Sequence, residues 1–553
     1  MEHLRAGPPP RPIVSIEAGQ VQEEDSDLRN RQHTLRFQIV SQNPSSQMSR
    51  KRPLGCPLRK IREIPLSFGK AIRSYRFALA AFLVPLFIRS IPEILVGPYP
   101  IGWDTIAFYV PTTLDWATGK TGWITVLGTA PLMYMLSIPA YLLTRVNPVW
   151  IFKIMGPILY GSMIWALFRF IRTRLKWPEK QALGGALLTS LYFVTLRISW
   201  DLYRNMLGLT FILLSLPLLD DWKTPRKQAL LSILTVLAVA SDQLTGVIAL
   251  VLIGSRTLMA LTKRQRTEFH EMLKIGLPGG ILFFSIAYAS LAVLGNGPVR
   301  IQSPFPAFSS LASSLGFLGY AYLALIPLIL LGLRSVPNFD LKTWSVFCVG
   351  IVSLALLPFF GPIVESYRWS LLLDIPLCIY AAAGLAKLAT MTRPSIQWVG
   401  RGQRILPIFS TILIVSAALY IALPAERAMV YYTAFPGLLP TSMTQDTVPM
   451  SDLGNLKALL ESAASRMGPQ TVLITHQAIY GWARAYLSTS AHLINYGYSN
   501  PLVGVEKANS AGYSNVLLIW WVNGSGWHDQ PYVPTGFAPE SQLGDLALYI
   551  FRN

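Results

Sequence analysis

The chain has 553 residues, of which 52% are hydrophobic and only 14% are charged, and its mean hydropathy is +0.42. A soluble protein of this length would carry more charge, so the composition indicates a polytopic membrane protein. The net charge of +19 does not indicate nucleic-acid binding, because the basic residues lie in short gaps between apolar segments, where anionic lipid headgroups are the natural partner.

The first 70 residues differ from the rest. They combine a Pro-rich stretch (PPPRP), an acidic stretch (EEDSD) and a basic run, without a sustained apolar period. This composition predicts that 1–70 is a disordered, basic cytoplasmic tail. The three cysteines predict neither a disulfide framework nor a zinc site, because two of them, Cys348 and Cys378, lie within apolar segments.

Eleven apolar segments near the bilayer-spanning length of ~20 residues follow the tail. They are 75–95, 149–168, 181–199, 205–221, 226–241, 244–262, 275–294, 313–333, 343–361, 367–390 and 405–424. A further segment, 122–145, is also apolar enough to cross. We therefore expect a polytopic α-helical membrane protein with about 11–13 transmembrane helices.

The distribution of Lys and Arg decides whether 122–145 crosses. If it does not, the gaps 169–180, 222–227, 263–274, 334–342 and 391–404 face the cytoplasm and hold seventeen basic residues, against six in the outer gaps. A full crossing would invert every later loop and break the positive-inside bias. We therefore predict that 122–145 is a juxtamembrane or re-entrant segment, interrupted by Pro131 and Pro139. The multi-span domain is 71–424, its first outer loop is 97–148, and the N-terminus is cytoplasmic.

After residue 424 the composition becomes that of a soluble domain. Buried strands are predicted at 471–476, 492–497, 515–522 and 546–551, alternating with helices near 453–466, 478–488 and 502–511. We expect 425–553 to form a small α/β domain, which an odd number of spans places outside the cytoplasm. It has no GxGxxG or phosphate-binding loop, so the sequence assigns it no nucleotide.

Polar residues gather in the gaps that this topology places outside. Asp104 lies in the first outer loop, about eight residues beyond the first span, where a carboxylate reaches both a lipid headgroup and an aqueous acceptor. Taken alone, Asp104 is also suited to cap a following short helix. The other candidates on this face are Trp103, Asp201, Arg204, Arg300, Glu365, Tyr367 and Arg368. Each arginine alone fits snorkelling, but guanidinium groups gathered with carboxylates fit a lipid phosphate beside a centre that needs a base.

Two acids within spans have simpler interpretations. Glu93 follows Arg89 by four residues, which predicts an i,i+4 ion pair. Asp374 lies well inside the tenth span and is interpreted as paired within the bundle.

A first span, an outer loop with an early acid (GWDTIAFY), a Pro-containing segment (APLMYML), many further spans and an outer C-terminal domain together resemble the GT-C superfamily of integral-membrane glycosyltransferases. That superfamily includes the dolichyl-phosphate-mannose-dependent protein mannosyltransferases and the oligosaccharyltransferases. The resemblance implies transfer of a sugar, with inversion, from a polyprenyl-phosphate carrier on the outer face.

The resemblance also implies roles for two residues. Asp104 matches the first-loop acid that serves as catalytic base, and Arg368 in ESYRW (365–369) resembles the arginine that holds the lipid-linked phosphate. The paired acids that the mannosyltransferases often carry are absent, because Thr105 follows Asp104. The oligosaccharyltransferase signature WWDYG is also absent, so transfer to a peptide asparagine is not supported.

Competing functions remain open at this stage. A lipid-linked saccharide flippase or other transporter also has many spans around a polar cavity, although no internal repeat is evident. A non-catalytic membrane assembly protein is the third class. The partners expected of a transferase are a polyprenyl-phosphate sugar, membrane lipids and an acceptor that is a glycan, a lipid or a protein. A divalent metal is optional in such chemistry. The protein would reside in the cell membrane, or in the ER membrane of a eukaryote.

Overall fold

The computed structural model describes residues 64–296, 311–354, 366–390, 399–426, 428, 439–487, 491–523 and 533–551. The predicted tail 1–70 therefore lies almost entirely outside the described residues. So do two of the predicted site residues, Arg300 and Glu365.

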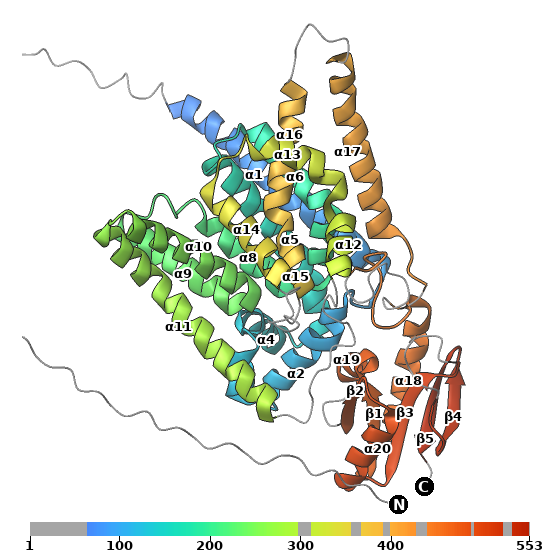
Figure 1. The fold of residues 1–553 in the computed structure, drawn as a ribbon. Coiled ribbons are helices and arrows are strands. Elements are labelled where there is room, and N and C mark those ends of the chain that lie inside the picture. The colour runs from blue at the N-terminus through green and yellow to red at the C-terminus, as the bar shows by residue number, and fades with distance from the viewer. Residues whose placement is uncertain are drawn as a thin grey trace, which may run out of the picture. The chain divides into compact units, whose positions relative to one another are not determined.

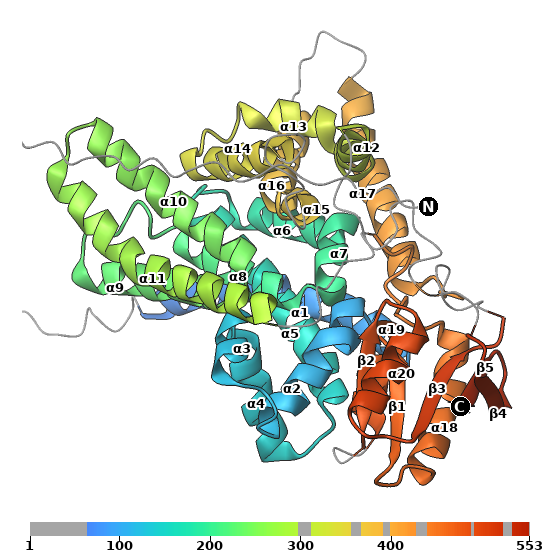
Figure 2. The ribbon, with the colours of Figure 1, turned by 60° about the horizontal axis from the view of Figure 1, so that its bottom comes forward.

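The described part of 64–426 is almost wholly helical (Figures 1 and 2). The elements up to residue 241 are α1 (Ile64–Leu95), the π-helix η2 (Thr105–Tyr109), α2 (Val110–Ala117), α3 (Trp123–Gly128), α4 (Leu132–Thr144), α5 (Pro148–Thr173), α6 (Glu179–Leu191), α7 (Phe193–Asp201), α8 (Tyr203–Ser215) and α9 (Pro225–Ser241). They are followed by α10 (Gln243–Thr262), α11 (Arg266–Asn296), α12 (Leu311–Tyr322), the 3-10 helix η3 (Leu323–Leu325), α13 (Ile326–Leu333), α14 (Phe339–Leu354), α15 (Ser366–Leu372), α16 (Asp374–Thr390) and α17 (Val399–Ala422).

The predicted fold class, a polytopic helical protein with a small C-terminal α/β domain, is confirmed. Six helical stretches among the described residues are long and apolar enough to cross a membrane: Tyr75–Leu95, Pro148–Thr173, Gln243–Thr262, Arg266–Ser290, Ala312–Leu333 and Tyr367–Ala389. The pair α6 and α7, which is bent by 66°, makes a seventh if it crosses as one span. Other predicted spans correspond to shorter helices, such as α8 with 13 residues and α14 with 16.

The segment 122–145 forms two short helices, α3 and α4, and no continuous span. Ala130, with φ at +55°, and Pro131 separate them. Since each residue adds about 1.5 Å, the 13 residues of α4 extend about 20 Å, which is less than the ~30 Å hydrocarbon core. The expectation that Pro139 would also interrupt this segment is wrong. Pro139 lies inside α4, within a continuous run of helical residues.

The loops fall into the two groups that the charge pattern predicted. Arg174 and Asp340 belong to two gaps on the predicted cytoplasmic side, and the structure brings them together with Asp220, at the end of the predicted span 205–221, and with Arg256 of α10. The guanidinium of Arg256 binds the fully buried Asp340 with two hydrogen bonds of 2.8 Å. The first loop meets the predicted outer gaps at the opposite ends of the same helices. A crossing at 122–145 would have separated those gaps from the first loop.

The C-terminal domain is a five-stranded sheet flanked by helices. Its elements are η5 (Met450–Asp452), α18 (Leu453–Ser465), β1 (Thr471–His476), α19 (Gln477–Tyr486), β2 (Leu493–Gly497), α20 (Pro501–Ser510), β3 (Asn515–Trp521), β4 (Phe537–Leu543) and β5 (Leu546–Phe551). The strand order is β2-β1-β3-β5-β4, with β1 parallel to β2 and β3, and β5 antiparallel to β3 and β4. All four predicted strands and all three predicted helices are present.

The sequence did not predict β4, which pairs only with β5 at the edge of the sheet. Its sequence, FAPESQL, contains a proline and charged or polar residues, and its side chains are exposed or half-buried. An edge strand tolerates proline and polar residues because the backbone groups on its outer side form no hydrogen bonds to another strand. Such a strand lacks the apolar run by which a buried strand is recognised in the sequence.

Helices α13 and α16 pack closely because two glycines face each other's backbones. A Cβ added at Gly332 would lie 1.8 Å from the carbonyl oxygen of Tyr380, and one added at Gly384 would lie 2.0 Å from that of Leu328. Such close approach through small residues is a common way for membrane helices to associate.

We predict that Gly332→Ala lowers the melting temperature of the detergent-solubilised protein, because the new methyl group forces α13 away from α16. Overpacking of this kind costs about 1–3 kcal/mol. The matched control is Gly350→Ala in α14, where an added Cβ meets nothing within 4 Å and helix propensity improves. Equal melting temperatures for the two variants would contradict the packing described here.

Candidate active site

Asp104 and Arg368 form an ion pair although they are 264 residues apart in sequence. Nη2 of Arg368 lies 3.3 Å from Oδ2 of Asp104, and both side chains are about 85% buried. Asp104 lies in the first loop immediately before η2, but its side chain makes no capping hydrogen bond to that helix. The interpretation of Asp104 as a helix cap is therefore wrong, and its carboxylate faces α15.

Asp201 of α7 contacts the backbone of Asp104, whereas Arg368 contacts its side chain. Oδ2 of Asp201 accepts a hydrogen bond of 3.3 Å from the backbone N–H of Asp104, and its Oδ1 is paired with Arg197. The approach requires Gly102, because a Cβ there would lie 2.6 Å from both the Asp201 Cβ and the Trp200 carbonyl oxygen. Gly102 also has φ at +90°, which L side chains rarely adopt. The first loop is thus held directly against the end of α7.

Arg204 provides a second guanidinium near this pair. Its Nη2 lies 3.4 Å from Oδ2 of Asp242, and its side chain is 22% exposed. Its charge also lies within electrostatic reach of Arg368. Asp242 also accepts from Asn205 and caps α10 through the backbone N–H groups of residues 244 and 245. Neither arginine extends away from the protein, so snorkelling does not describe Arg204 or Arg368.

The structure therefore brings together six of the eight predicted site residues. Tyr367 is half-buried, and its hydroxyl lies 3.3 Å from Nε of Arg368. Trp103 is buried beside Asp104 and donates a hydrogen bond to Tyr498 of the C-terminal domain. Asp374, in contrast, accepts hydrogen bonds from Thr195 and Cys378 within the bundle.

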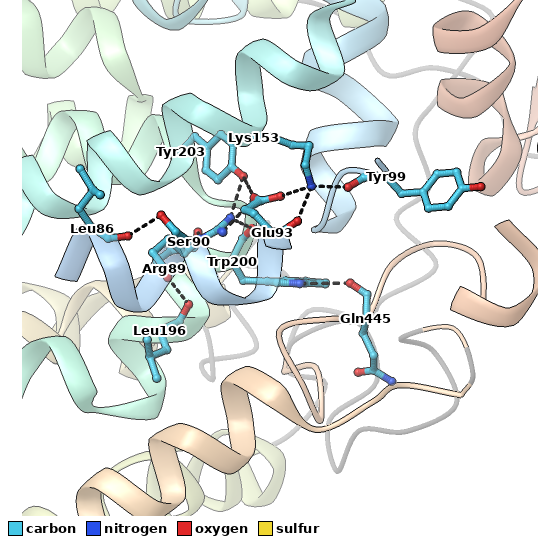
Figure 3. Close-up of polar contacts among 11 residues, drawn as sticks. Leu86, Arg89, Ser90, Glu93, Tyr99, Lys153, Leu196, Trp200, Tyr203 and Gln445 are labelled. Atoms are coloured by element: carbon cyan, nitrogen blue, oxygen red, sulfur yellow. Dashed lines mark hydrogen bonds and ion pairs between the residues drawn. The ribbon is translucent and has the colours of Figure 1, made fainter. Parts of the chain in front are cut away.

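A buried charge cluster supports the first loop from the membrane side (Figure 3). Arg89 pairs with Glu93 at 2.9 Å, as predicted, and also donates to Ser199, Trp200 and Tyr203 around the α7–α8 junction. Lys153 of α5 completes the cluster. Its ammonium donates to the Glu93 carboxylate at 3.0 Å, to the Glu93 carbonyl at 2.8 Å and to the Tyr99 carbonyl at 2.6 Å. These bonds tie the end of α1 and the start of the loop to α5 and α7.

Two further titratable groups of this region, Tyr109 and His476, are neutral at physiological pH. Burial raises the pKa of Tyr109 well above its usual value, and the charge of Asp104 adds to the rise while Arg204 opposes it. Burial lowers the pKa of His476 to about 3, and its Nδ1 accepts a hydrogen bond from the backbone N–H of Ala478. Neither group is suited to take a proton from an acceptor, which leaves a carboxylate for that role.

Within the described residues, no group of three or more His, Cys, Asp or Glu side chains is arranged to hold a metal ion. The arrangement present is the Asp104 carboxylate paired with Arg368, with Arg204, which is paired with Asp242, within electrostatic reach. Guanidinium groups bind phosphate oxygens through charge-assisted hydrogen bonds, and a partly exposed carboxylate can accept a proton from a hydroxyl.

Sequence reasoning missed three groups at this site. Lys153 could have been identified from the sequence, because a lysine inside an apolar span usually has a buried partner. Nothing in the sequence identifies Gln477 and Tyr498 of the C-terminal domain, because only the tertiary fold brings them to residues 103–107.

No family model and no curated protein sequence matches the chain. Among solved structures, the chain is similar to ArnT from Cupriavidus metallidurans, whose crystal structure contains undecaprenyl phosphate. The similarity has a TM-score of 0.50 with 12% sequence identity, and it covers 87% of this chain and 98% of ArnT. It shows a shared fold.

We predict that Lys153→Met lowers the melting temperature in detergent. The change keeps the length of the side chain but removes the ammonium from a cluster whose ion-paired side chains are about 94% buried. Removing one partner of a buried pair typically costs about 3–5 kcal/mol. Lys274→Met is the control, because Lys274 is 71% exposed. If Lys153→Met has the same melting temperature as the wild type, the cluster does not hold the loop.

Proposed function

We propose that the protein is a membrane glycosyltransferase that moves a sugar from a polyprenyl-phosphate carrier to a hydroxyl-bearing acceptor, with inversion at the sugar carbon. The observation that carries the proposal is the pairing of Asp104 with Arg368 at the end of the helices, with Arg204 beside them. The shared fold with ArnT, a protein solved with undecaprenyl phosphate bound, supports a lipid phosphate as the carrier.

Arg368 and Arg204 would hold the carrier phosphate. A guanidinium carries five N–H donors, so Arg368 can bind phosphate oxygens while it keeps its contact with Asp104. Tyr367 lies against Nε of Arg368 and fixes the orientation of the guanidinium plane. Arg300 and Glu365 lie outside the described residues and stay sequence-based candidates for the same site.

Asp104 would act as the base. The acceptor O–H gives its proton to the Asp104 carboxylate, and the oxygen forms a bond to the anomeric carbon. The bond between that carbon and the phosphate oxygen breaks, and its electron pair stays on the phosphate. Arg368 and Arg204 stabilise the charge that develops on that oxygen, which is where preorganised cations contribute most to rate. Asp201 keeps Asp104 in place through the backbone N–H.

The site would face the extracytosolic side. The basic-residue pattern favours an outer position for the Asp104 end and for the C-terminal domain, and the separate contacts of the two groups of loops support that proposal. The site would then meet the lipid headgroup region and the aqueous compartment at once.

We predict that Asp104→Asn abolishes sugar transfer in membranes supplied with a panel of radiolabelled polyprenyl-phosphate sugars. The amide keeps the shape of the side chain but cannot take the proton, and general-base catalysis contributes about 10²–10⁴-fold. Asp221→Asn is the control, because Asp221 is 69% exposed and pairs only with Lys227 among the described residues. Undiminished transfer by Asp104→Asn would remove Asp104 as the base.

Arg368→Ala should raise the KM for the polyprenyl-phosphate donor at least about tenfold, because a charge-assisted contact to phosphate is lost. The control is Arg172→Ala, which removes a partly exposed arginine paired with Glu179. An unchanged donor KM would show that Arg368 does not hold the phosphate.

Transferase and flippase are separated by supplying the donor already in the outer leaflet of sealed vesicles. A transferase then forms labelled product, because its substrate is at the site. A flippase forms none, because its task is to move the lipid and no bond is made. Absence of product from every donor in the panel would favour the flippase.

A further inference from the structure

The C-terminal domain holds the chain on both sides of Asp104. On one side, the indole N–H of Trp103 donates to the hydroxyl of Tyr498. On the other side, the carbonyl of Ala107 in η2 accepts a hydrogen bond of 3.4 Å from Nε2 of Gln477. Asp104 lies between these two contacts in the sequence.

Both contacts come from one edge of the C-terminal sheet. Gln477 follows β1 and Tyr498 follows β2, and these strands are parallel neighbours. Asn495 connects them, because its amide donates to Oε1 of Gln477 at 2.6 Å. The carboxyl ends of parallel strands are the usual position of ligand-binding residues in α/β sheets, and here they contact the first loop.

The backbone of α19 lies directly against η2. A Cβ added at Gly481 would lie 1.5 Å from the carbonyl oxygen of Ile106, so only glycine fits. Arg484 pairs with Asp115, and Asn147 donates to the carbonyl of Ala485 at 2.9 Å. The C-terminal domain thus packs directly against the π-helix η2, and short π-helical turns frequently occur at functional sites.

Tyr498 is itself fixed and neutral. Its ring packs edge-on against His476 with centroids 5.3 Å apart, and His476 packs against Trp520 at 5.0 Å. Burial raises the pKa of Tyr498, and the nearby charge of Asp104 raises it further. The hydroxyl therefore stays protonated beside the carboxylate and cannot compete for the acceptor proton.

We propose that Tyr498 and Gln477 of the C-terminal domain are positioning residues for the Asp104 carboxylate. Tyr498 fixes the residue before Asp104, and Gln477 fixes the turn after it. The inference rests on the proposed function, because it assigns these residues a role in sugar transfer. It makes the C-terminal domain part of the catalytic unit.

The test is a double-mutant cycle on the Trp103–Tyr498 hydrogen bond. Trp103→Phe removes the donor, Tyr498→Phe removes the acceptor, and the double variant removes both. Each single variant should lower the maximal rate of transfer from a labelled polyprenyl-phosphate sugar about tenfold, because a carboxylate displaced by ~1 Å loses productive geometry. The double variant should be no slower than either single variant, and the donor KM should stay within about twofold of wild type.

Gln477→Met provides an independent arm, since it keeps the side-chain length without the N–H donor. It should also lower the maximal rate and leave the donor KM unchanged. Tyr513→Phe is the control within the same domain, where the ring packs on His492 away from the first loop. Melting temperatures in detergent show whether each variant is folded. If Gln477→Met does not fold, Asn495→Asp takes its place, because the Asn495 change removes the amide that donates to Gln477.

The outcomes separate this inference from the proposed function. If Asp104→Asn and Arg368→Ala transfer normally, the proposed function fails. If those variants are impaired but Tyr498→Phe and Gln477→Met retain the wild-type maximal rate, only the positioning role fails. Rate losses that multiply in the Trp103 and Tyr498 double variant would also overturn it, because the two residues would then act separately.

Discussion

The ion pair between Asp104 and Arg368 is the contact on which the proposed chemistry depends. It joins the first loop to a helix near the end of the membrane domain, across 264 residues of sequence. The loop that carries Asp104 lies against α7 at Gly102, Lys153 and Arg89 hold the end of α1, and α19 packs against η2. Each support holds a different part of the chain that flanks Asp104.

Ion pairs between carboxylates and guanidinium groups lie at both ends of the membrane domain. At one end, Asp340 and Asp220 pair with Arg174 and Arg256, which closes the loops that the basic residues place in the cytoplasm. At the other end, Arg368–Asp104 and Arg204–Asp242 meet at single contacts of 3.3–3.4 Å, beside the buried Arg197–Asp201 pair. Buried bidentate pairs suit a structural role, whereas partly exposed groups with single contacts retain capacity for a ligand.

Much of the fold could be predicted from the sequence because membrane spans and buried strands carry strong patterns. The basic-residue count correctly grouped Asp104, Asp201, Arg204 and Arg368 at one end, and apolar runs located four of five strands. The edge strand β4 lacks that pattern, and Pro139 is accommodated inside α4. The contacts of Gln477 and Tyr498 could not be predicted, because they depend on how two domains pack.

The most direct test of the central claim is binding of undecaprenyl phosphate to the purified protein, measured by native mass spectrometry with undecaprenol as the uncharged comparison. If Arg368 and its neighbours form a lipid-phosphate site, the wild type retains the phosphate form in preference to the alcohol, and Arg368→Ala loses that preference. Equal retention of the two lipids by the wild type, or an unchanged preference in Arg368→Ala, would contradict the account.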